Sequence, residues 1–289
     1  MPAMRWVIGN ILKGSVLWAC AASLFGAETP RAQLRVERAV RFLPETRAER
    51  ADLYAPLERR TPAPAVLVLH GGGFYGGSRD ADREEEICRF LARAGYLVLS
   101  ADYALSDRGQ AVWPENLFDC KRAVFWLRSN AERLQVDPER IAVLGISAGG
   151  HLAAMLALTG PADGLEPPDL AGADCKVQAC VDLYGPSDLT GLSRLSMLGP
   201  TRAEDPRLYR QASPVHFASP EDPPMLIVHG TADATVDPEH SRLLALTLKR
   251  AGVAAELEWI DGGGHGFGLD AEGAPGKRVL EFLARVLRK

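Results

Sequence analysis

Gly145-Ile146-Ser147-Ala148-Gly149 is the stretch that decides the fold of this 289-residue chain. It follows an apolar run, Ile141–Ile146, and opens a helical pattern, Ser147–Thr159. A G-x-S-x-G sequence between a strand and a helix is typical of a nucleophile elbow, because the glycines relieve crowding in a strained turn. We therefore expect Ser147 to lie exposed at a helix N-terminus, where the helix dipole stabilises negative charge. The alternative is a serine that only caps the helix.

Outward from this turn, short apolar runs alternate with longer helical patterns. The runs do not alternate apolar with polar residues, which is typical of strands covered on both faces in a parallel sheet. Strand–helix alternation predicts an α/β fold with a mostly parallel sheet. The expected strands are Ala65–His70, Leu97–Asp102, Ile141–Ile146, Ala179–Leu183, Met225–His229 and Leu257–Ile260. The expected helices are Asp82–Arg93, Glu115–Asn130, Ser147–Thr159, Pro238–Ala251 and Lys277–Arg288.

Two further strands, Leu34–Val40 and Arg50–Tyr54, are expected as an antiparallel pair at the sheet edge, which makes about eight strands in all. No linker divides the chain after its first residues, so we expect one catalytic domain over residues 28–289. The Pro-rich segments Gly160–Asp174 and Ser187–Pro224 are expected to be loops over a binding cleft, because functional residues are often carried on loops held by a rigid scaffold.

A second glycine-rich loop, His70-Gly71-Gly72-Gly73-Phe74, follows the first buried strand. Glycines allow backbone N–H groups to turn toward one point and leave room for a ligand. We expect the N–H groups of Gly72, Gly73 and Ala148 to form an oxyanion hole, where donors face an oxygen that gains charge. A tight structural turn is the alternative.

A third glycine-rich loop, residues 261–267, follows the last strand and contains His265. A serine hydroxyl needs a base to take its proton, and His265 lies at the appropriate end of a strand. The base needs a carboxylate to fix its tautomer. Asp233, at the start of the loop after Met225–His229, is the expected acid. Asp237 is the alternative, although its place before Pro238 favours a helix cap.

The composition is that of an ordinary globular protein, with 47% hydrophobic residues and a formal charge of −4. There is no excess of Lys and Arg, so the sequence argues against nucleic-acid binding. The 28 glycines exceed the roughly 20 expected from average usage, and the three loops above account for much of this surplus.

The N-terminus is patterned as a secretory signal over residues 1–27. Arg5 and Lys13 are followed by the uncharged run Gly14–Ala27, which is too short for a comfortable membrane span. We expect export to the periplasm or the medium, with cleavage after Ala21 or Ala27. A lipid anchor at Cys20 is the second interpretation, and a cytosolic protein with a leader of no export function is the third.

The remaining cysteines are Cys88, Cys120, Cys175 and Cys180. They show no C-x-x-C spacing, so we expect no zinc site. Export would permit Cys175 and Cys180 to pair, but small buried thiols are the commoner outcome, and we expect no essential disulfide. The expected chemistry requires neither a metal nor another cofactor.

Four motifs together resemble the α/β-hydrolase superfamily: HGGGF at 70–74, GISAGGHLA at 145–153, HGTADATVD at 229–237 and GGGHGF at 262–267. More closely, they resemble the small esterases related to hormone-sensitive lipase, including acetyl-xylan and feruloyl esterase-like members. The resemblance implies a triad of Ser147, Asp233 and His265. The sequence departs from the family at Ala104, where an Arg is usual. It also has no long helical cap before HGGG. A minimal cap implies short acyl groups.

The resemblance therefore implies hydrolysis of short-chain acyl esters, acetyl above all, through an acyl-enzyme. The substrate is either a small molecule or an ester carried on plant or algal polysaccharide. Phe74, Tyr75 and Trp113 are candidates for lining its pocket, with ordinary packing under loops as the alternative. The rival functions are a small amidase or formamidase, a serine peptidase of the prolyl-oligopeptidase kind, and a catalytically dead hydrolase used as a binding module.

Overall fold

The computed structural model describes residues 33–107, 110–270 and 273–287. Residues Ala32–Lys289 form one compact unit. The expected signal sequence, residues 1–27, and the alternative lipid anchor at Cys20 lie outside the described residues.

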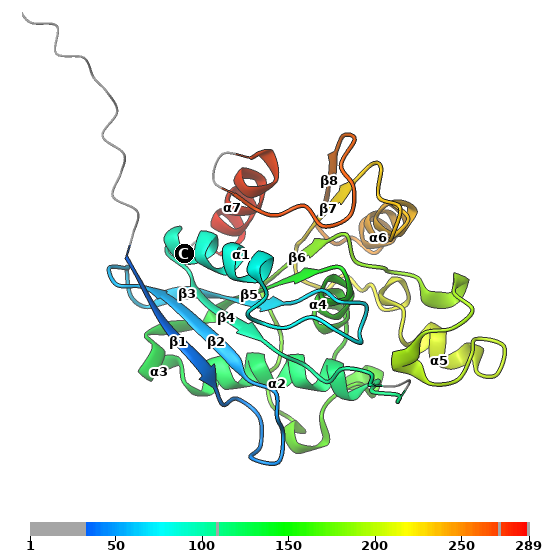
Figure 1. The fold of residues 1–289 in the computed structure, drawn as a ribbon, viewed down its shortest axis with the longest axis horizontal. Helices are drawn as coiled ribbons and strands as arrows, with labels where there is room; N and C mark the ends of the chain where they lie inside the picture. The colour runs from blue at the N-terminus through cyan, green and yellow to red at the C-terminus, as the bar shows by residue number, and fades with distance from the viewer. Residues whose placement is uncertain (1–32, 108–109, 271–272, 288–289) are drawn as a thin grey trace, which may run out of the picture. The chain divides into compact units, whose positions relative to one another are not determined.

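An eight-stranded sheet forms the centre of this unit, with the order β1-β2-β4-β3-β5-β6-β7-β8 (Figure 1). β1 and β2 are antiparallel to each other and β2 is antiparallel to β4, whereas all later neighbours are parallel. This confirms the predicted α/β-hydrolase architecture and its antiparallel edge. The strands are β1 Leu34–Val40, β2 Ala51–Pro56, β3 Ala63–Leu69, β4 Leu97–Ala101, β5 Val136–Ile146, β6 Ala179–Leu183, β7 Met225–Gly230 and β8 Ala255–Ile260.

Helices cover both faces of the sheet. Apolar residues of α1 and α7 pack on one face in one hydrophobic core, and those of α2, α3, α4 and α6 pack on the other face in a second core. Figure 1 shows α1 and α7 on the side of the sheet opposite α2. The helices are α1 Asp82–Arg93, α2 Glu115–Ser129, α3 Ala131–Leu134, α4 Ala148–Leu158, α5 Pro206–Gln211, α6 Glu239–Arg250 and α7 Ala274–Val286.

The five predicted helices are present, with ends that differ by up to three residues. The segments predicted as irregular loops contain short helical turns instead. Pro161–Asp163 and Pro168–Leu170 form 3-10 turns in the first, and α5 lies in the second. α5 begins after Asp205, whose carboxylate accepts a hydrogen bond from the N–H of Leu208. Local capping therefore produces helical turns that an apolar periodicity does not reveal.

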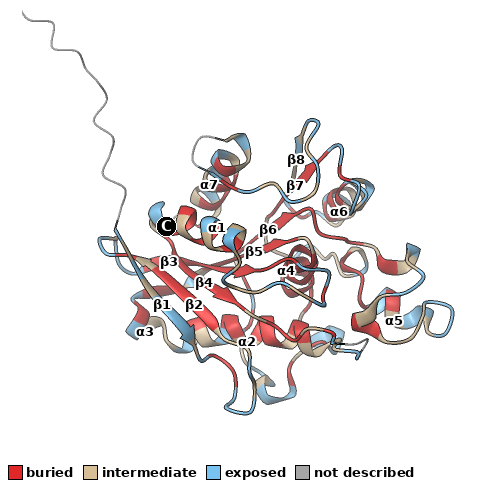
Figure 2. Cartoon of the chain, viewed as in Figure 1, coloured by how far each residue is buried: buried red, intermediate tan, exposed pale blue. Residues whose placement is uncertain are grey.

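Burial is concentrated in the middle strands (Figure 2). Every residue of β4, β6 and β7 is buried, whereas β1 and β8 at the two sheet edges are only partly covered. This pattern explains the continuous apolar runs in the sequence, because a strand between two helical layers has no solvent face.

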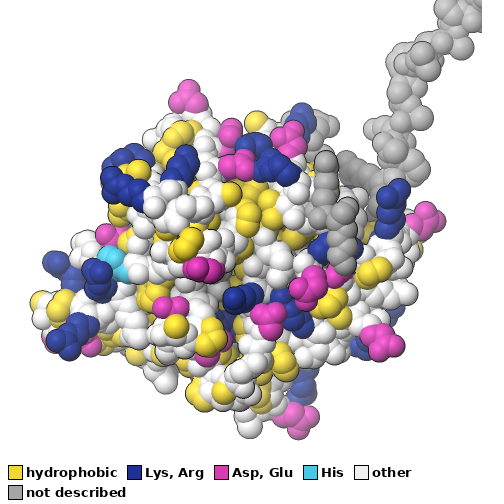
Figure 3. Space-filling view, turned by 180° about the vertical axis from the view of Figure 1, so that it is seen from behind, with side chains coloured by type: hydrophobic (Ala, Val, Ile, Leu, Met, Phe, Trp, Pro, Cys, Tyr) yellow, Lys and Arg dark blue, Asp and Glu magenta, His cyan; other side chains and the backbone are white. Residues whose placement is uncertain are grey.

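The four cysteines of the described part are free and buried, as predicted. Burial raises the pKa of Cys175 to about 11, so its thiol stays protonated at neutral pH. In the ranges that the structure describes, no helix is long and apolar enough to span a bilayer. Figure 3 shows basic and acidic side chains interspersed over one face of the molecule.

Candidate active site

Ser147 occupies a strained turn between β5 and α4. Its backbone has φ 55° and ψ −115°, a conformation that costs energy for a residue with a side chain. The turn is held because the N–H of Ser147 donates to the carbonyl of Leu183 at 2.8 Å and its own carbonyl accepts from His151. Ser147 is half-buried while its neighbours in the motif are buried. The predicted elbow is therefore present, and it exposes the hydroxyl.

Gly149 explains why this motif needs glycine. A Cβ at this position would lie 2.2 Å from the carbonyl oxygen of Leu69 and 2.5 Å from that of His70. The first turn of α4 is thus packed directly against the backbone at the end of β3. This contact brings the helix N-terminus beside the HGGG loop, which leaves the end of the same strand.

Ser147, His265 and Asp233 form a continuous chain of hydrogen bonds. His265 Nε2 lies 3.0 Å from Ser147 Oγ, and His265 Nδ1 lies 2.7 Å from Asp233 Oδ2. The three residues come from the loops after β5, β7 and β8 and meet at the carboxyl ends of the parallel strands, where ligands bind in α/β sheets. Because Asp233 engages Nδ1, the His265 Nε2 atom faces the serine, which is the arrangement that activates a hydroxyl.

Asp233 is fully buried and strongly bonded. Its Oδ1 accepts from the N–H groups of Thr235 and Val236, at 2.8 and 3.0 Å. Burial alone would raise its pKa, but the hydrogen bonds from His265 and these two N–H groups outweigh that effect and hold the pKa below its usual value. Asp237, the alternative acid, instead accepts from the N–H of Glu239 at 2.9 Å, at the start of α6.

A second histidine, which the sequence analysis did not assign to the site, also contacts Asp233. His229 Nε2 lies 3.1 Å from Asp233 Oδ2 and 3.0 Å from the carbonyl of Val236. Since a carbonyl can only accept, Nε2 carries the proton and donates. Nδ1 then accepts from the hydroxyl of Ser241 at 2.6 Å. The signal in the sequence was the position of His229 four residues before the acid, at the end of a buried strand.

The HGGG loop lies beside Ser147. A Cβ on Gly71 would be 3.5 Å from the Ser147 Cβ, and Gly72 has φ 126°, which favours glycine. The N–H of Gly71 donates to the buried Glu84 carboxylate at 3.2 Å, which anchors the loop to α1. Ala148 is the first residue of α4, and the first N–H groups of a helix have no partner within it.

Arg83 and Tyr184 support the loop that carries His265. The ring of Tyr184 lies edge-on to the His265 ring with centroids 4.7 Å apart, and its hydroxyl donates to the Phe267 carbonyl at 3.1 Å. Arg83 pairs with Glu84 at 2.6 Å and lies close to Gly266, where a Cβ would be 3.5 Å from its Nη1. Arg83 lies in no motif that would have identified it, whereas Tyr184 begins the segment Tyr184–Leu189, which resembles the same esterases but does not indicate a role for this ring.

The three candidate pocket residues have different surroundings. Phe74 is 3% exposed and packs edge-on against His151, with ring centroids 5.2 Å apart. Trp113 is partly buried and its ring centroid lies 6.4 Å from that of His151. Phe74 therefore packs in the core, which is the alternative that the sequence left open. Tyr75 is 72% exposed and lies over Gly73, where it is accessible to a ligand.

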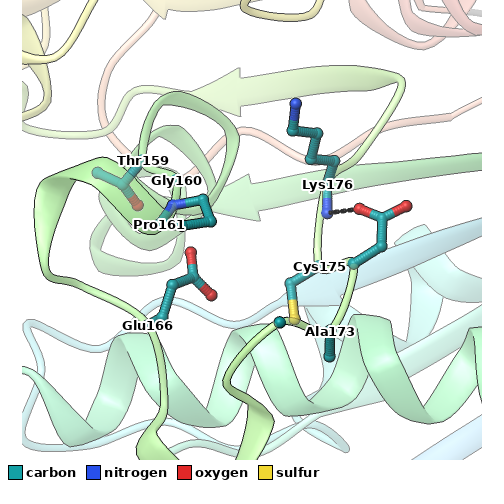
Figure 4. A pocket seen from close by; sticks show the side chains of 9 residues that line it. Thr159, Gly160, Pro161, Glu166, Ala173, Cys175 and Lys176 are labelled. Carbon is teal, nitrogen blue, oxygen red and sulfur yellow. Dashed lines mark hydrogen bonds between the residues drawn. The ribbon is translucent and has the colours of Figure 1, made fainter.

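A separate cavity of about 380 Å³, lined by Glu166, Cys175 and Lys176 among others, is shown in Figure 4. It begins at Thr159, beyond the far end of α4. At 1.5 Å per residue, the eleven residues of this helix place it about 16 Å from Ser147. It therefore lies outside the site described here. Among the described residues, no group of three or more His, Cys, Asp or Glu side chains could hold a metal ion.

Comparison with known proteins agrees with this geometry. The chain is similar to Esterase LipC of Mycobacterium tuberculosis, with 34% identity over 223 residues, which cover 72% of this chain and 54% of LipC. It is also similar to the ethyl acetate hydrolase of Pseudomonas putida, with 33% identity over 218 residues, covering 70% of this chain and 65% of that protein. The chain thus spans roughly half to two thirds of the length of these relatives.

Among solved structures, a truncated form of a carbohydrate esterase from gut microbiota superposes with a TM-score of 0.78 and 27% identity, over 90% of this chain and 98% of that one. The BD-FAE family model matches residues 51–248, a range that includes both the elbow serine and Asp233. With an α/β-hydrolase fold and this match over more than half of its length, the chain belongs to the BD-FAE family.

Proposed function

We propose that this protein is a serine carboxylic-ester hydrolase that removes short acyl groups, acetyl in particular, through an acyl-enzyme. The observation that carries the proposal is the hydrogen-bonded chain Ser147–His265–Asp233, with the serine in a strained, half-buried elbow. The names of the similar proteins support ester hydrolysis as the reaction class.

The first half of the proposed reaction forms a Ser147–acyl bond. His265 Nε2 takes the proton of Ser147 Oγ as this oxygen attacks the ester carbonyl, and Asp233 stabilises the imidazolium that results. The carbonyl oxygen becomes an oxyanion, which the N–H groups of Gly72, Gly73 and Ala148 are proposed to bind. The tetrahedral intermediate then collapses, the bond to the alkoxy group breaks, and His265 gives its proton to the departing alcohol.

The second half repeats these steps with water. His265 takes a proton from water, the hydroxide attacks the acyl carbonyl, and Ser147 Oγ leaves with the proton returned by His265. The acid is released and the free enzyme is restored. Loss of one oxyanion donor typically costs about 3 kcal/mol of transition-state stabilisation, so the proposed scheme gives the glycine loop a direct role in catalysis.

The proposed natural substrate is a short acyl ester carried on a carbohydrate. Two observations support it: the gut structure that superposes over most of the chain is a carbohydrate esterase, and a relative hydrolyses ethyl acetate by its name. In addition, the described stretch from β1 to the HGGG loop contains no helix that could form a cap. The export proposed from residues 1–27 would bring the enzyme to extracellular polysaccharide; a small-molecule ester is the alternative substrate.

The test compares the wild type with Ser147→Ala on p-nitrophenyl acetate, butyrate and octanoate, on acetylated xylan and on an aminoacyl-nitroanilide. We expect Ser147→Ala to lower kcat on the acetate by at least about 10⁴-fold. Ser193→Ala, which removes a hydroxyl from an exposed loop, is the matched control and should retain full activity. Undiminished turnover by folded Ser147→Ala would overturn the assignment, and faster cleavage of the anilide than of the esters would favour a peptidase.

A further inference from the structure

A hollow of about 530 Å³ lies beside the site just described and is not used by the proposed chemistry. It is bounded by Trp259 at the end of β8, by Thr231 and Asp261 in the loops that follow β7 and β8, and by Asp237 and Arg242 near the start of α6. We call it the Trp259 pocket. We propose that the Trp259 pocket is a carbohydrate subsite, in which a sugar ring of the ester substrate lies on the indole; this rests on the proposed function.

Trp259 is suited to such a contact because its side chain is accessible. It is 39% exposed, one of four large hydrophobic side chains that the described part of the molecule leaves exposed. The buried ring of His229 lies next to the indole, with centroids 6.2 Å apart and the two planes tilted by 49°. An amphipathic aromatic ring held in this way offers a flat apolar face, and the C–H face of a pyranose is its natural complement.

The rim of the pocket provides hydrogen-bonding groups for hydroxyls. Asp237 and Asp261 are exposed carboxylates, and Arg242 pairs with Glu239 through its Nε at 2.5 Å. The hydroxyl of Thr231 lies 3.4 Å from Asp261 Oδ1. An aromatic wall with a few convergent polar groups is the usual composition of a small-molecule site. With three carboxylates against one guanidinium, the pocket disfavours a phosphorylated or otherwise anionic ligand.

A small organic cation is the other ligand that carboxylates and an indole attract, through a cation–π contact. Two observations favour the sugar. Sites for quaternary ammonium ions surround the cation with several aromatic rings, whereas Trp259 is the aromatic residue that lines this pocket. Its volume also exceeds the needs of a single ammonium group and accommodates a sugar ring with neighbouring units.

The pocket is connected to the catalytic residues through shared loops. Thr231 lies two residues before Asp233, and Asp261 lies four residues before His265. The two loops are joined because the Gly262 N–H donates to Thr231 Oγ1 at 2.8 Å. From β5, which leads to Ser147, to β8 there are three strand spacings, or roughly 14 Å. A short oligosaccharide can cover that distance, with its ester at Ser147 and a more distant unit at Trp259.

The test measures binding directly and does not depend on turnover. Xylohexaose, cellohexaose and mannohexaose are titrated by calorimetry into the Ser147→Ala protein, alone and combined with Trp259→Leu, Trp259→Phe or Phe125→Leu. Leucine keeps an apolar contact for His229 but removes the flat ring. Phe125 is a matched control, because it is an aromatic residue of α2 with 37% exposure. For at least one hexaose we expect Trp259→Leu to weaken binding about tenfold.

Trp259→Phe is expected to restore most of the affinity and Phe125→Leu to leave it unchanged. In the active enzyme, the ratio of kcat/KM on acetylated xylohexaose to kcat/KM on p-nitrophenyl acetate should fall about tenfold with Trp259→Leu. Equal hexaose affinities for Trp259→Leu and Phe125→Leu, or tighter binding of choline than of every hexaose, would overturn the subsite. Sugar binding by a wild type that hydrolyses no ester would overturn the proposed function and retain the subsite.

Discussion

Asp233 accepts hydrogen bonds from two histidine rings through the same carboxylate oxygen. His265 Nδ1 approaches Oδ2 at 2.7 Å and His229 Nε2 approaches it at 3.1 Å. His229 is held in turn by Ser241 from α6. The orientation of the carboxylate, and through it that of the His265 ring, therefore depends on a buried residue that touches neither Ser147 nor the region where a substrate carbonyl would lie. His229 is a positioning residue.

We predict that His229→Ala lowers kcat on p-nitrophenyl acetate about tenfold with little change in KM, because a hydrogen bond to a charged group is worth roughly 1.5–3 kcal/mol. His229→Gln should recover part of this loss, since its amide nitrogen can replace the donor. Steady-state kinetics on both variants, with circular dichroism to confirm folding, provide the measurement. A wild-type kcat in folded His229→Ala would show that Asp233 is positioned without this ring.

At the scale of single residues, the sequence identifies the side chains whose chemical type the reaction requires. It does not identify residues whose role depends only on where the fold places them. Ser147 and His265 lie in glycine-rich loops that are visible without a structure, and Asp233 was preferred to Asp237 because of its distance from the strand end. Arg83 has no such context, and the segment that begins at Tyr184 does not indicate a role for the tyrosine ring. Their positions depend on how α1 and β6 pack against the His265 loop, which no local pattern encodes.

α4 is the element on which the site depends most. Its first residues pack so closely on the end of β3 that a side chain at Gly149 has no room, as the 2.2 Å separation from the Leu69 carbonyl shows. That contact joins the elbow to the HGGG loop. The sequence predicted this helix because the motif and the apolar pattern coincide, whereas α5 was missed because it is only six residues long and begins with an isolated cap.

We predict that Gly149→Ala destabilises the protein by about 3 kcal/mol or more, because overpacking against rigid backbone cannot be relieved by a rotamer change. The added Cβ should push the N-terminus of α4 away from the end of β3, which would move Ala148 away from Gly72 and lower kcat on p-nitrophenyl acetate. Gly160→Ala is the control: it lies two residues beyond the end of α4, and its Cβ would contact nothing within 4 Å. Urea denaturation and initial rates measure both effects. Similar unfolding free energies for the two variants would contradict the packing argument.

On the scale of the whole molecule, the strands and their mostly parallel arrangement could be predicted from the sequence because buried parallel strands produce recognisable apolar runs, whereas the order of the strands in the sheet is known only from the structure. The residues that surround the site were harder to predict from the sequence. Phe74 was a candidate for the substrate pocket, but a positive φ of 68° turns its ring into the core against His151. The sequence indicates only that Trp259 lies in a strand, because its exposure depends on which strand forms the sheet edge, and that is a property of the complete sheet.

Two buried histidines on different elements, His151 and His70, make stability depend on pH. Burial lowers the pKa of His151 to about 4 and also lowers that of His70. His151 Nδ1 lies 2.9 Å from the Pro186 carbonyl, and so donates to it. Within the described residues, the Nε2 atom of each ring has no hydrogen-bond partner. A proton added there would lie uncompensated in the core, so the folded protein binds it much more weakly than the unfolded chain does.

The sign of the pH effect follows from this difference. Between pH 6.5, where an unfolded histidine titrates, and about pH 4, the unfolded chain binds a proton that the folded protein rejects, so the free energy of unfolding falls as the pH is lowered. For His151 the full loss is about 3 kcal/mol. We predict that His151→Asn, whose amide can still donate to Pro186, is less stable at pH 7.5 but loses less stability between pH 6.5 and 4.5 than the wild type. Urea denaturation across this range measures both slopes, and parallel slopes would mean that His151 already titrates normally in the folded protein.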